Sequence, residues 1–440
     1  MAKILIALHQ FFPRFYTGTE TLAQEVAEEL TRRGHEVVIL TAEPLLQGDN
    51  QPEFPELHKD TYAGLKVWRL VVPIPVNELE RLDRESCDYK VVNLYEQLLA
   101  EETPDVVHVF HLMRLTMSFV ETVKKQGIPV FFTTTDFWVL CPTYQLIRHD
   151  DSLCNKPDPV KCFTCLLSMY MQGMKKPPRK YLLARQFPRI AAILNKGMKN
   201  CHLLLNERIE RHQKLMQMID GVFWSNSFIR DMFHRNGLKC KTEEVVSFPV
   251  PEKAKALYEL PTPLASTSLR VAFIGTLRPT KGPQVLINAL KRIRKDLPVD
   301  VSIWGAPEFP PFLDELKELA AGDSRIKFRG TFQQEQFASV LSETDIVVIP
   351  SIWYENTPLT ALSVMAARRV LIASDLGGLA SLIENGKNGF LFQPGDAGEL
   401  ANILIRLAQD KGLVGRIIEE ITPPLRIKDY VDRVLMTYFR

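Results

Sequence analysis

Short runs of consecutive apolar residues alternate along the chain with segments of helical periodicity. Lys3–Leu8 and Ile346–Ile349 are two such runs, and each leads through a polar turn into a helical segment. Continuous apolar runs of this length are typical of strands that are buried on both faces of a parallel sheet. The pattern therefore predicts an α/β fold made of strand–helix–strand units.

The first half of the chain carries one complete set of these units. Its predicted strands are Lys3–Leu8, Glu36–Thr41, Leu65–Leu70, Asp105–Phe110, Pro129–Thr133 and Val222–Ser225. Its predicted helices are Thr21–Arg33, Ser86–Ala100, Met117–Lys125 and Ser227–Asn236. The Pro-, Lys- and Glu-rich segment Pro249–Ser268 is then predicted to link this half to a second domain.

The second half repeats the α/β pattern, which agrees with two or three domains for 440 residues. Its predicted strands are Leu269–Ile274, Val299–Gly305, Ile326–Gly330, Ile346–Ile349 and Val370–Ala373. Its predicted helices include one from about Pro283 to Ile293, one that begins near Asn356–Pro358, and a last one at Tyr430–Phe439.

Two loops of the second half place charged side chains between a strand and a helix. Gly275, Arg278 and Lys281 precede one helix, and Glu355 precedes another. Cations beside a helix N-terminus form a phosphate site that needs no metal. A carboxylate next to that site would repel phosphate, so a sugar hydroxyl is its natural partner.

These segments resemble the donor-binding motifs of retaining glycosyltransferases of the GT-B fold, family four (glycosyltransferase group 1). The resemblance implies two doubly wound, Rossmann-like α/β domains facing a cleft. Residues 1–250 would form the acceptor-side domain and residues 251–425 the nucleotide-sugar domain, and 426–440 would be a helix that crosses back. It also implies transfer of a hexose, with retention, from a UDP-, GDP- or ADP-sugar to a glycan or lipid-linked acceptor.

The same resemblance implies roles for individual residues. Arg278 and Lys281 would hold the donor diphosphate, Glu355 would hold the transferred sugar, and His111 would act on the acceptor side. The other donor-binding positions that it implies are Gly18, Gly275, Asn356, Thr357, Pro358, Leu359 and Ser363. No convincing Asp-x-Asp motif is present, so no catalytic metal is expected at the diphosphate.

The chain departs from the family pattern at several positions. Ser363 stands where the second Glu of the Glu-x7-Glu motif is expected, Phe110 and Thr135 stand where histidines are usual, and Arg368 replaces a usual Gly. A serine hydroxyl that replaces a carboxylate on a ribose weakens that contact by on the order of 1–2 kcal/mol. A non-catalytic accessory GT-B subunit with a degenerate donor site is therefore an alternative. A Rossmann-type oxidoreductase is a second one, although the GxGxxG fingerprint is missing.

Four of the seven cysteines gather in residues 136–166, namely Cys141, Cys154, Cys162 and Cys165. Four thiolates in a loop without its own core suit a structural zinc ion, an iron–sulfur cluster is possible with the same ligands, and His149 could replace one of them. Four reduced thiols are the alternative. A similar Asp-Phe-Trp…Cys loop occurs in a subset of the glycosyltransferases that this chain resembles.

The net charge of +2 conceals a strongly basic segment. Residues 161–240 contain 15 Lys and Arg against 4 Asp and Glu, a net of +11, so the other 360 residues carry −9. This segment includes a basic helical insert, 167–220, which would face anionic lipid or an anionic acceptor, or would simply be a solvated helical wall.

The overall composition is that of a soluble globular protein, with 46% hydrophobic and 24% charged residues. No apolar run approaches the roughly 20 residues that cross a bilayer, and Met1–Phe12 predicts a strand better than a signal peptide. We therefore expect a cytoplasmic protein, possibly peripheral on the inner membrane face, and no nucleic-acid partner.

Overall fold

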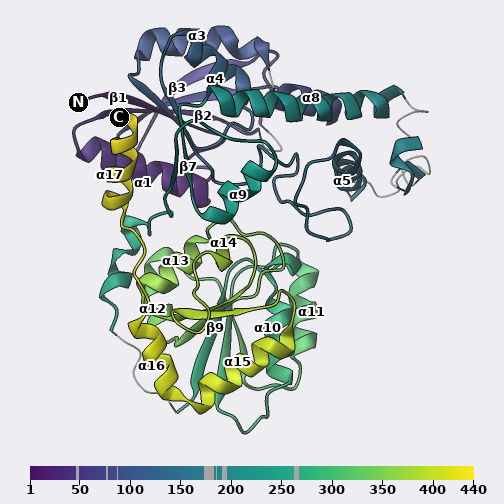
Figure 1. Ribbon diagram of the computed structural model, residues 1–440, viewed down its shortest axis with the longest axis vertical. Coiled ribbons are helices and arrows are strands. Elements are labelled where there is room, and N and C mark those ends of the chain that lie inside the picture. Colours follow the sequence, from purple (N-terminus) through teal and green to yellow (C-terminus); the bar gives the residue numbers. More distant parts are fainter. Residues whose placement is uncertain are drawn as a thin grey trace. The chain divides into compact units, whose positions relative to one another are not determined.

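A computed structural model of the protein describes residues 1–45, 49–75, 78–86, 88–172, 183–184, 186–190, 196–261 and 267–440. The chain divides into two compact units. Unit 1 contains Met1–Ser225, Ile229–Val246 and Val431–Arg440, and unit 2 contains Asn226–Phe228 and Ser247–Tyr430. Each unit is built around one sheet (Figure 1).

The sheet of unit 1 has the strand order β3–β4–β2–β1–β5–β6–β7–β8. Neighbouring strands are parallel except for the antiparallel pair β3 and β4. Its strands are β1 (Lys3–Leu8), β2 (Glu36–Ala42), β3 (Glu56–Tyr62), β4 (Leu65–Val71), β5 (Val106–Val109), β6 (Val130–Thr133), β7 (Gly221–Trp224) and β8 (Glu243–Val245). Strand β8, which no apolar run predicts, is a short polar strand at the sheet edge.

Helices cover this sheet close to the predicted positions. They are α1 (Gly18–Arg32), α2 (Glu78–Ser86), α3 (Val92–Glu102), α4 (Thr116–Lys125), α5 (Pro159–Gln172), α8 (Lys196–Met218), α9 (Ser227–Arg235) and the end of α17 (Ile427–Tyr438). The helix predicted over Ser86–Ala100 begins too early, because α2 ends at Ser86 and a short 3-10 turn, Tyr89–Val91, precedes α3. Helix α1 begins earlier than predicted, because Thr17 and Glu20 form a capping box at its N-terminus.

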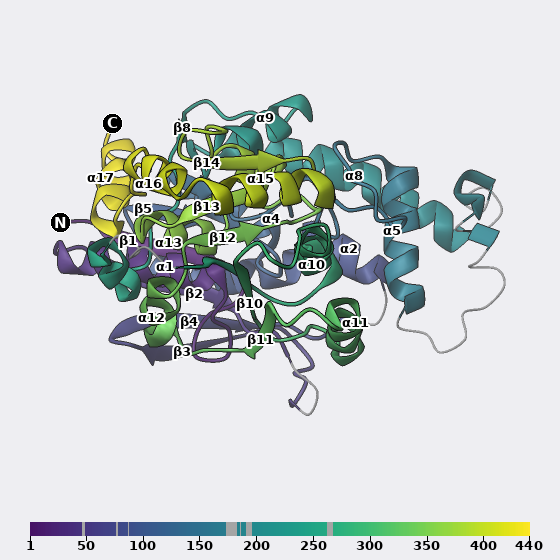
Figure 2. The same cartoon turned by 90° about the horizontal axis from the view of Figure 1, so that it is seen from below.

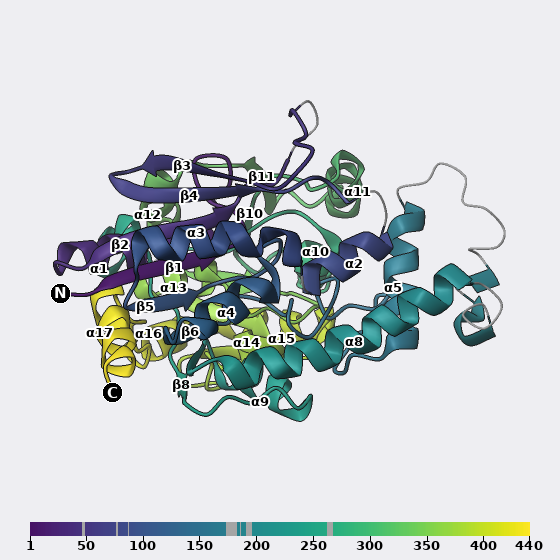
Figure 3. The same cartoon turned by 90° about the horizontal axis from the view of Figure 1, so that it is seen from above.

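Helices α2, α5 and α8 enclose a small apolar core of their own, to which Leu82, Phe163 and Leu205 contribute one residue from each helix. Figure 3 shows α8 running past α2 toward α5. Cys162 and Cys165 lie on α5. The expectation of a cysteine loop without its own core is therefore wrong.

The last residues of α17 pack on unit 1, and Figure 1 shows this helix, in yellow, next to α1. The Tyr438 hydroxyl lies 2.5 Å from His108 Nδ1, and His108 Nε2 lies 2.8 Å from the Thr133 hydroxyl. Arg33 adds an ion pair with Asp432. Since complete burial removes water from the imidazole, it lowers the pKa of His108 to about 3.

The sheet of unit 2 is parallel throughout, in the order β11–β10–β9–β12–β13–β14. Its strands are β9 (Leu269–Ile274), β10 (Val299–Trp304), β11 (Ile326–Gly330), β12 (Ile346–Ile349), β13 (Val370–Ser374) and β14 (Gly389–Phe392). The strand order reverses between β9 and β12. At such a switch point, doubly wound folds bind ligands beyond the carboxyl ends of the strands.

The helices of unit 2 cover both faces of its sheet. They are α10 (Pro283–Lys291), α11 (Pro310–Ala320), α12 (Phe337–Ser342), α13 (Leu359–Ala366), α14 (Gly377–Ala380), α15 (Ala397–Gln409) and α16 (Lys411–Glu419). Figure 2 shows the strands between α12 and α13 on one side and α10 and α11 on the other. Two doubly wound α/β units therefore confirm the predicted fold class. In the part of the chain that the structure describes, no helix is both long and apolar enough for a bilayer.

Candidate functional site

The loops that follow β9 and β12 bring the predicted cation and carboxylate of unit 2 together. Lys281 Nζ lies 2.6 Å from Glu355 Oε1. The same oxygen accepts hydrogen bonds of 2.8 Å from the Ser351 hydroxyl and the Trp353 indole N–H. Glu355 is buried, with a side chain 8% exposed, whereas that of Lys281 is 27% exposed. One oxygen of the Glu355 carboxylate thus accepts from three donors, which fixes the orientation of the Glu355 side chain.

Trp353 also positions the second predicted cation. The Arg278 guanidinium lies 5.1 Å from the Trp353 ring centroid, and Lys281 Nζ lies 5.2 Å from it. Both cations are within the range of a cation–π contact. Arg278 Nε is also 3.1 Å from Glu308 Oε2. Sequence reasoning missed Trp353, although an aromatic residue two positions before the key Glu was a usable signal.

Gly282 permits the close approach of these loops. Gly282 has a φ of +75°, and a Cβ there would lie 1.9 Å from the Pro350 carbonyl oxygen. Any side chain at Gly282 would therefore push the Lys281 loop away from the loop that follows β12. Gly275, a predicted donor-binding residue, follows β9 and donates its N–H to the Trp304 carbonyl at 3.1 Å.

The backbone after Glu355 is held from two directions. Gly378 N–H donates to the Glu355 carbonyl at 2.8 Å. Asn226, which belongs to unit 2, donates from Nδ2 to the Asn356 carbonyl at 3.0 Å and to the Thr357 hydroxyl at 2.9 Å. Neither Gly378 nor Asn226 was among the predicted site residues, because each is distant in sequence.

Helix α13 begins at Leu359, and its N-cap is Pro358 instead of the predicted Asn356 or Thr357. Leu359 therefore opens the helix. Ser363 lies buried inside it, with 4% of its surface exposed. The predicted donor-binding residues from Asn356 to Ser363 thus form one continuous loop-to-helix segment.

The candidate acceptor-side residue His111 lies in unit 1, after β5. Its Nε2 is 2.8 Å from Asp136 Oδ2, and its Nδ1 accepts the Met113 N–H at 3.0 Å. The second contact assigns the proton to Nε2, so His111 donates to Asp136. Both ring nitrogens are engaged within the protein, and Asp136, whose side chain is 33% exposed, is the more accessible partner.

His9 packs against His111, with ring centroids 4.1 Å apart and the ring planes tilted by 36°. Burial, together with nearby His111 and Arg114, holds the pKa of His9 well below its usual value. His9 is a neighbour that the sequence did not indicate. Gly18 is the first residue of α1, directly after the cap Thr17.

The two departures near His111 have structural roles. Phe110 is fully buried and packs against His108, with ring centroids 4.4 Å apart. The Thr135 hydroxyl donates to the Phe110 carbonyl at 3.0 Å. Neither residue supplies an ionisable group.

The four cysteines of the predicted metal site do not support a metal. Cys141 Sγ contacts the Thr143 hydroxyl, and Cys154 Sγ contacts the Lys156 carbonyl. Among the residues that the structure describes, no group of three or more His, Cys, Asp or Glu is arranged to hold a metal ion. The prediction of zinc or an iron–sulfur cluster is not supported.

The basic segment 161–240 is only partly described. Lys175, Lys176, Arg179 and Lys180, on which the predicted anionic contact partly rested, lie outside the described residues. Its described part exposes several large apolar side chains, namely Met169, Leu183, Phe187, Ile190 and Leu203.

Two family models match separate parts of the chain. Residues 17–154 match the "Glycosyl transferase 4-like domain", and residues 268–410 match "Glycosyl transferases group 1". The first match lies in unit 1 and the second in unit 2. Together they cover more than half of the chain.

Curated relatives match over a shorter stretch. D-inositol 3-phosphate glycosyltransferase of Corynebacterium efficiens is 33% identical over 147 residues, which are 32% of this chain and 34% of the relative. Alpha-D-kanosaminyltransferase of Streptomyces kanamyceticus is 30% identical over 154 residues, which are 35% of this chain and 40% of that protein. The match thus spans about a third of the length of these relatives.

Solved structures match over the whole chain. HepE of Anabaena, in complex with UDP and glucose, has a TM-score of 0.62 at 15% identity, and 99% of each chain is covered. Sucrose-phosphate synthase of Thermosynechococcus elongatus has a TM-score of 0.62 at 16% identity, covering 100% of this chain and 98% of that one. At these identities the likeness shows a shared fold, and that fold is GT-B.

Proposed function

We propose that this chain, which belongs to the group 1 family of glycosyltransferases, transfers a hexose from a nucleoside diphosphate sugar to an acceptor hydroxyl with retention. In this proposal Arg278 and Lys281 bind the donor diphosphate, and Glu355 binds the transferred sugar. The sugar–phosphate bond breaks as the new glycosidic bond forms, and the two cations stabilise the charge that develops on the leaving diphosphate. These cations would do so without a metal ion.

The contact between Lys281 and Glu355 carries this proposal. It joins a cation and a carboxylate from two loops at the switch point of the unit 2 sheet. Trp353 fixes both, because it donates to Glu355 and lies under Lys281 and Arg278. A ligand with a diphosphate beside sugar hydroxyls matches this combination of charges.

Calorimetric binding of UDP, GDP and ADP tests the donor site. Because charge-assisted hydrogen bonds contribute about 1.5–3 kcal/mol, we expect Lys281→Met to weaken binding of the preferred nucleotide by at least tenfold. Lys291→Met, at the exposed end of α10, is the matched control and should bind normally. Equal binding by both variants would refute the assignment of Lys281.

Lys281→Met also leaves Glu355 buried without its cation, which is expected to lower the melting temperature. The double variant Lys281→Met/Glu355→Gln separates the two effects. It should recover much of the lost stability but not the nucleotide affinity. Recovery of both would mean that Lys281 acts only on the fold.

The accessory-subunit alternative rests on Ser363, which supplies a hydroxyl where a carboxylate is expected. The two functions differ in turnover. A glycosyltransferase releases free nucleoside diphosphate from the donor in the presence of an acceptor, whereas an accessory subunit binds the nucleotide without consuming the sugar donor. Measurement of nucleoside diphosphate release from the sugar donor therefore decides between them.

A glycan or lipid-linked acceptor is part of the same proposal. The exposed side chains of Leu183, Phe187 and Ile190 lie in a segment of net positive charge, which supports contact with an anionic lipid surface. Cosedimentation with vesicles of phosphatidylglycerol, compared with phosphatidylcholine, tests that contact. Equal sedimentation with both lipids would contradict it.

A further inference from the structure

Unit 1 contains a cavity of about 270 Å³, close to the lower end of the range for small-ligand sites, which begins near ~300 Å³. Its wall includes Glu43 after β2, Pro73 after β4 and Arg114 after β5, together with residues of α2. The cavity thus lies beyond the carboxyl ends of the strands, where parallel sheets bind ligands. Its role is not explained by the donor site, which belongs to unit 2.

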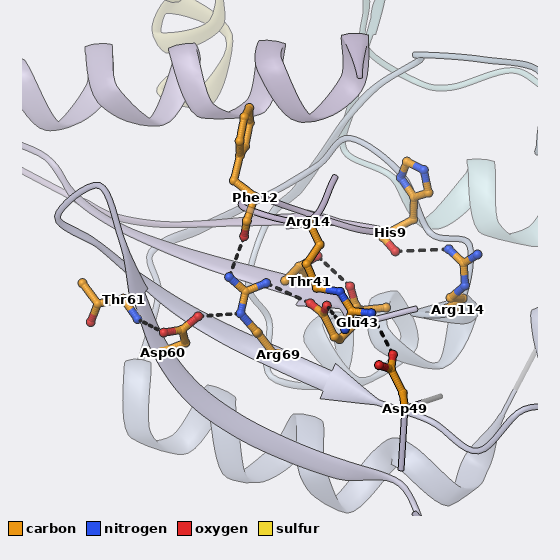
Figure 4. A network of polar contacts seen from close by, with 11 residues as sticks. His9, Phe12, Arg14, Thr41, Glu43, Asp49, Asp60, Thr61, Arg69 and Arg114 are labelled. Atoms are coloured by element: carbon orange, nitrogen blue, oxygen red, sulfur yellow. Dashed lines mark hydrogen bonds and ion pairs between the residues drawn. The ribbon is translucent and has the colours of Figure 1, made fainter. Parts of the chain in front are cut away.

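Most charges around this cavity are already paired. Figure 4 shows Glu43 between Arg14 and Arg69, whose guanidinium nitrogens lie 3.1 and 2.9 Å from its carboxylate oxygens. Arg84 pairs with Asp88 at 3.1 Å. Arg81 pairs with Glu85 at 2.7 Å. These pairs leave little net charge on their part of the wall.

Arg114 differs from the other arginines of the wall. Its guanidinium donates a long hydrogen bond of 3.4 Å to the main-chain oxygen of His9 (Figure 4). Among the described residues, no carboxylate lies within ion-pair distance of it. Burial lowers the pKa of Arg114, and the nearby Glu85 carboxylate offsets only part of that effect. An anion in the cavity would offset the rest.

The wall also offers an acceptor without a donor. Glu85 Oε1 accepts from Arg81, but Glu85 Oε2 is buried and has no hydrogen-bond partner among the described residues. A buried acceptor of this kind is costly unless a ligand donates to it. A hydroxyl group is the simplest donor. The cavity thus presents a cation without an ion pair of its own and an unused carboxylate oxygen.

The backbone at this place is strained. Arg114 and Thr116 have φ values of +66° and +62°, in the left-handed region that costs a residue with a β-carbon about 1–3 kcal/mol. For the β-branched Thr116 this conformation is rare. Arg114 and Thr116, the first residue of α4, line the same cavity, and the dipole at a helix N-terminus favours negative charge. Strain of this kind is retained where a ligand site requires it.

We propose that this cavity binds the acceptor through an anionic group on Arg114 and the α4 N-terminus, and through a hydroxyl group on Glu85. The acceptor is then a hydroxylated anion, such as a phosphorylated sugar or a sugar acid. The identification of this ligand as the acceptor rests on the proposed function, whereas the anion-binding site itself does not. Phosphate and carboxylate share the required chemistry, and the test separates them.

Calorimetry on the full chain without a donor tests the proposal, with glucose 6-phosphate, glucuronate, glucose and inorganic phosphate as probes. We expect one of the two hydroxylated anions to bind at least tenfold more tightly than glucose. Inorganic phosphate should bind more weakly than the phosphorylated sugar, because it offers no sugar hydroxyl to Glu85. Glucose that binds as tightly as either anion would overturn the proposal.

Arg114→Gln should lower the affinity for the preferred anion at least tenfold, and Arg114→Lys should retain part of that affinity. Arg230→Gln, on α9, is the control and should bind normally. Should Arg114→Gln fold poorly, Ile74→Trp fills the exposed rim of the cavity and keeps the arginine. Unchanged anion binding in Arg114→Gln or, if that variant does not fold, in Ile74→Trp would refute the site.

Nucleotide binding in the same samples keeps this inference apart from the proposed function. The Arg114 variants should bind the nucleotide as the natural chain does, and Lys281→Met should bind the anion as the natural chain does. Absence of nucleotide binding in every sample, with anion binding intact, would defeat the transferase proposal alone. The reverse result would defeat the cavity proposal alone.

Discussion

Arg368 adopts a backbone conformation that suits glycine. It follows the last residues of α13 with a φ of +50° and an exposed side chain. The left-handed region costs a non-glycine residue roughly 1–2 kcal/mol. Glycine avoids this cost, but it loses more backbone entropy on folding, so the net gain is smaller. We predict that Arg368→Gly raises the free energy of unfolding by about 1 kcal/mol, as measured by urea denaturation.

Arg368→Ala is the control for this prediction. It removes the same exposed side chain but keeps a β-carbon in the left-handed region. Its stability should therefore stay close to that of the natural chain. An equal gain in both variants would mean that the side chain, and not the backbone, limits stability at this position.

Ser363 tests the donor site at the scale of one side chain. If this hydroxyl contacts the ribose, Ser363→Ala should weaken nucleotide binding several-fold. Ser363→Glu should strengthen it about tenfold, because a charged acceptor makes roughly twice as strong a hydrogen bond. Calorimetry with the preferred nucleotide measures both changes. Unchanged nucleotide affinity in both variants would show that Ser363 does not contact the ribose.

At the level of elements, the cysteine segment shows what spacing cannot reveal. The Cys-x2-Cys spacing is compatible with ligands in a loop, but Cys162 and Cys165 lie on α5, whose apolar face packs with α8. The stability of this segment therefore has a source other than a metal. The periodicity of the apolar residues Phe163, Leu166 and Leu167 was the signal for the helix.

Metal removal tests that conclusion. We predict that the purified protein contains much less than one zinc or iron per chain by elemental analysis. Overnight dialysis against EDTA should leave the melting temperature unchanged, because apolar packing holds α5. One zinc per chain, together with a lower melting temperature after EDTA, would restore the metal site.

For the whole molecule, the sequence was sufficient for the central strands of both sheets because these are continuous apolar runs. It also singled out Lys281 and Glu355, since each lies in a loop between such a strand and a helix. It was not sufficient for contacts between distant segments. Asn226 reaches Asn356 across 130 positions, and Arg114 lines a cavity formed by three separate loops. No local pattern encodes these contacts.

Unit 1 is predicted to lose stability in mild acid through its buried histidines. His108 keeps its neutral form when folded, with a pKa of about 3, whereas an unfolded chain takes up a proton near pH 6.5. Between these values the unfolded state binds more protons, so the free energy of unfolding falls as the pH falls. One such histidine contributes about 1.4 kcal/mol per pH unit. Urea denaturation at pH 7.0, 6.0 and 5.0 measures the slope.

His108→Gln assigns that slope to one residue. Glutamine does not titrate, so the variant should be less stable at pH 7, where it disturbs the contacts with Thr133 and Tyr438, but should lose less stability on acidification. His58→Gln, on the exposed strand β3, should keep the full slope. Because His108 also anchors α17 through Tyr438, the natural chain should expose this helix to proteolysis in the same pH range. An acid slope in His108→Gln equal to that of the natural chain would mean that other groups, such as His9 or His212, carry the effect.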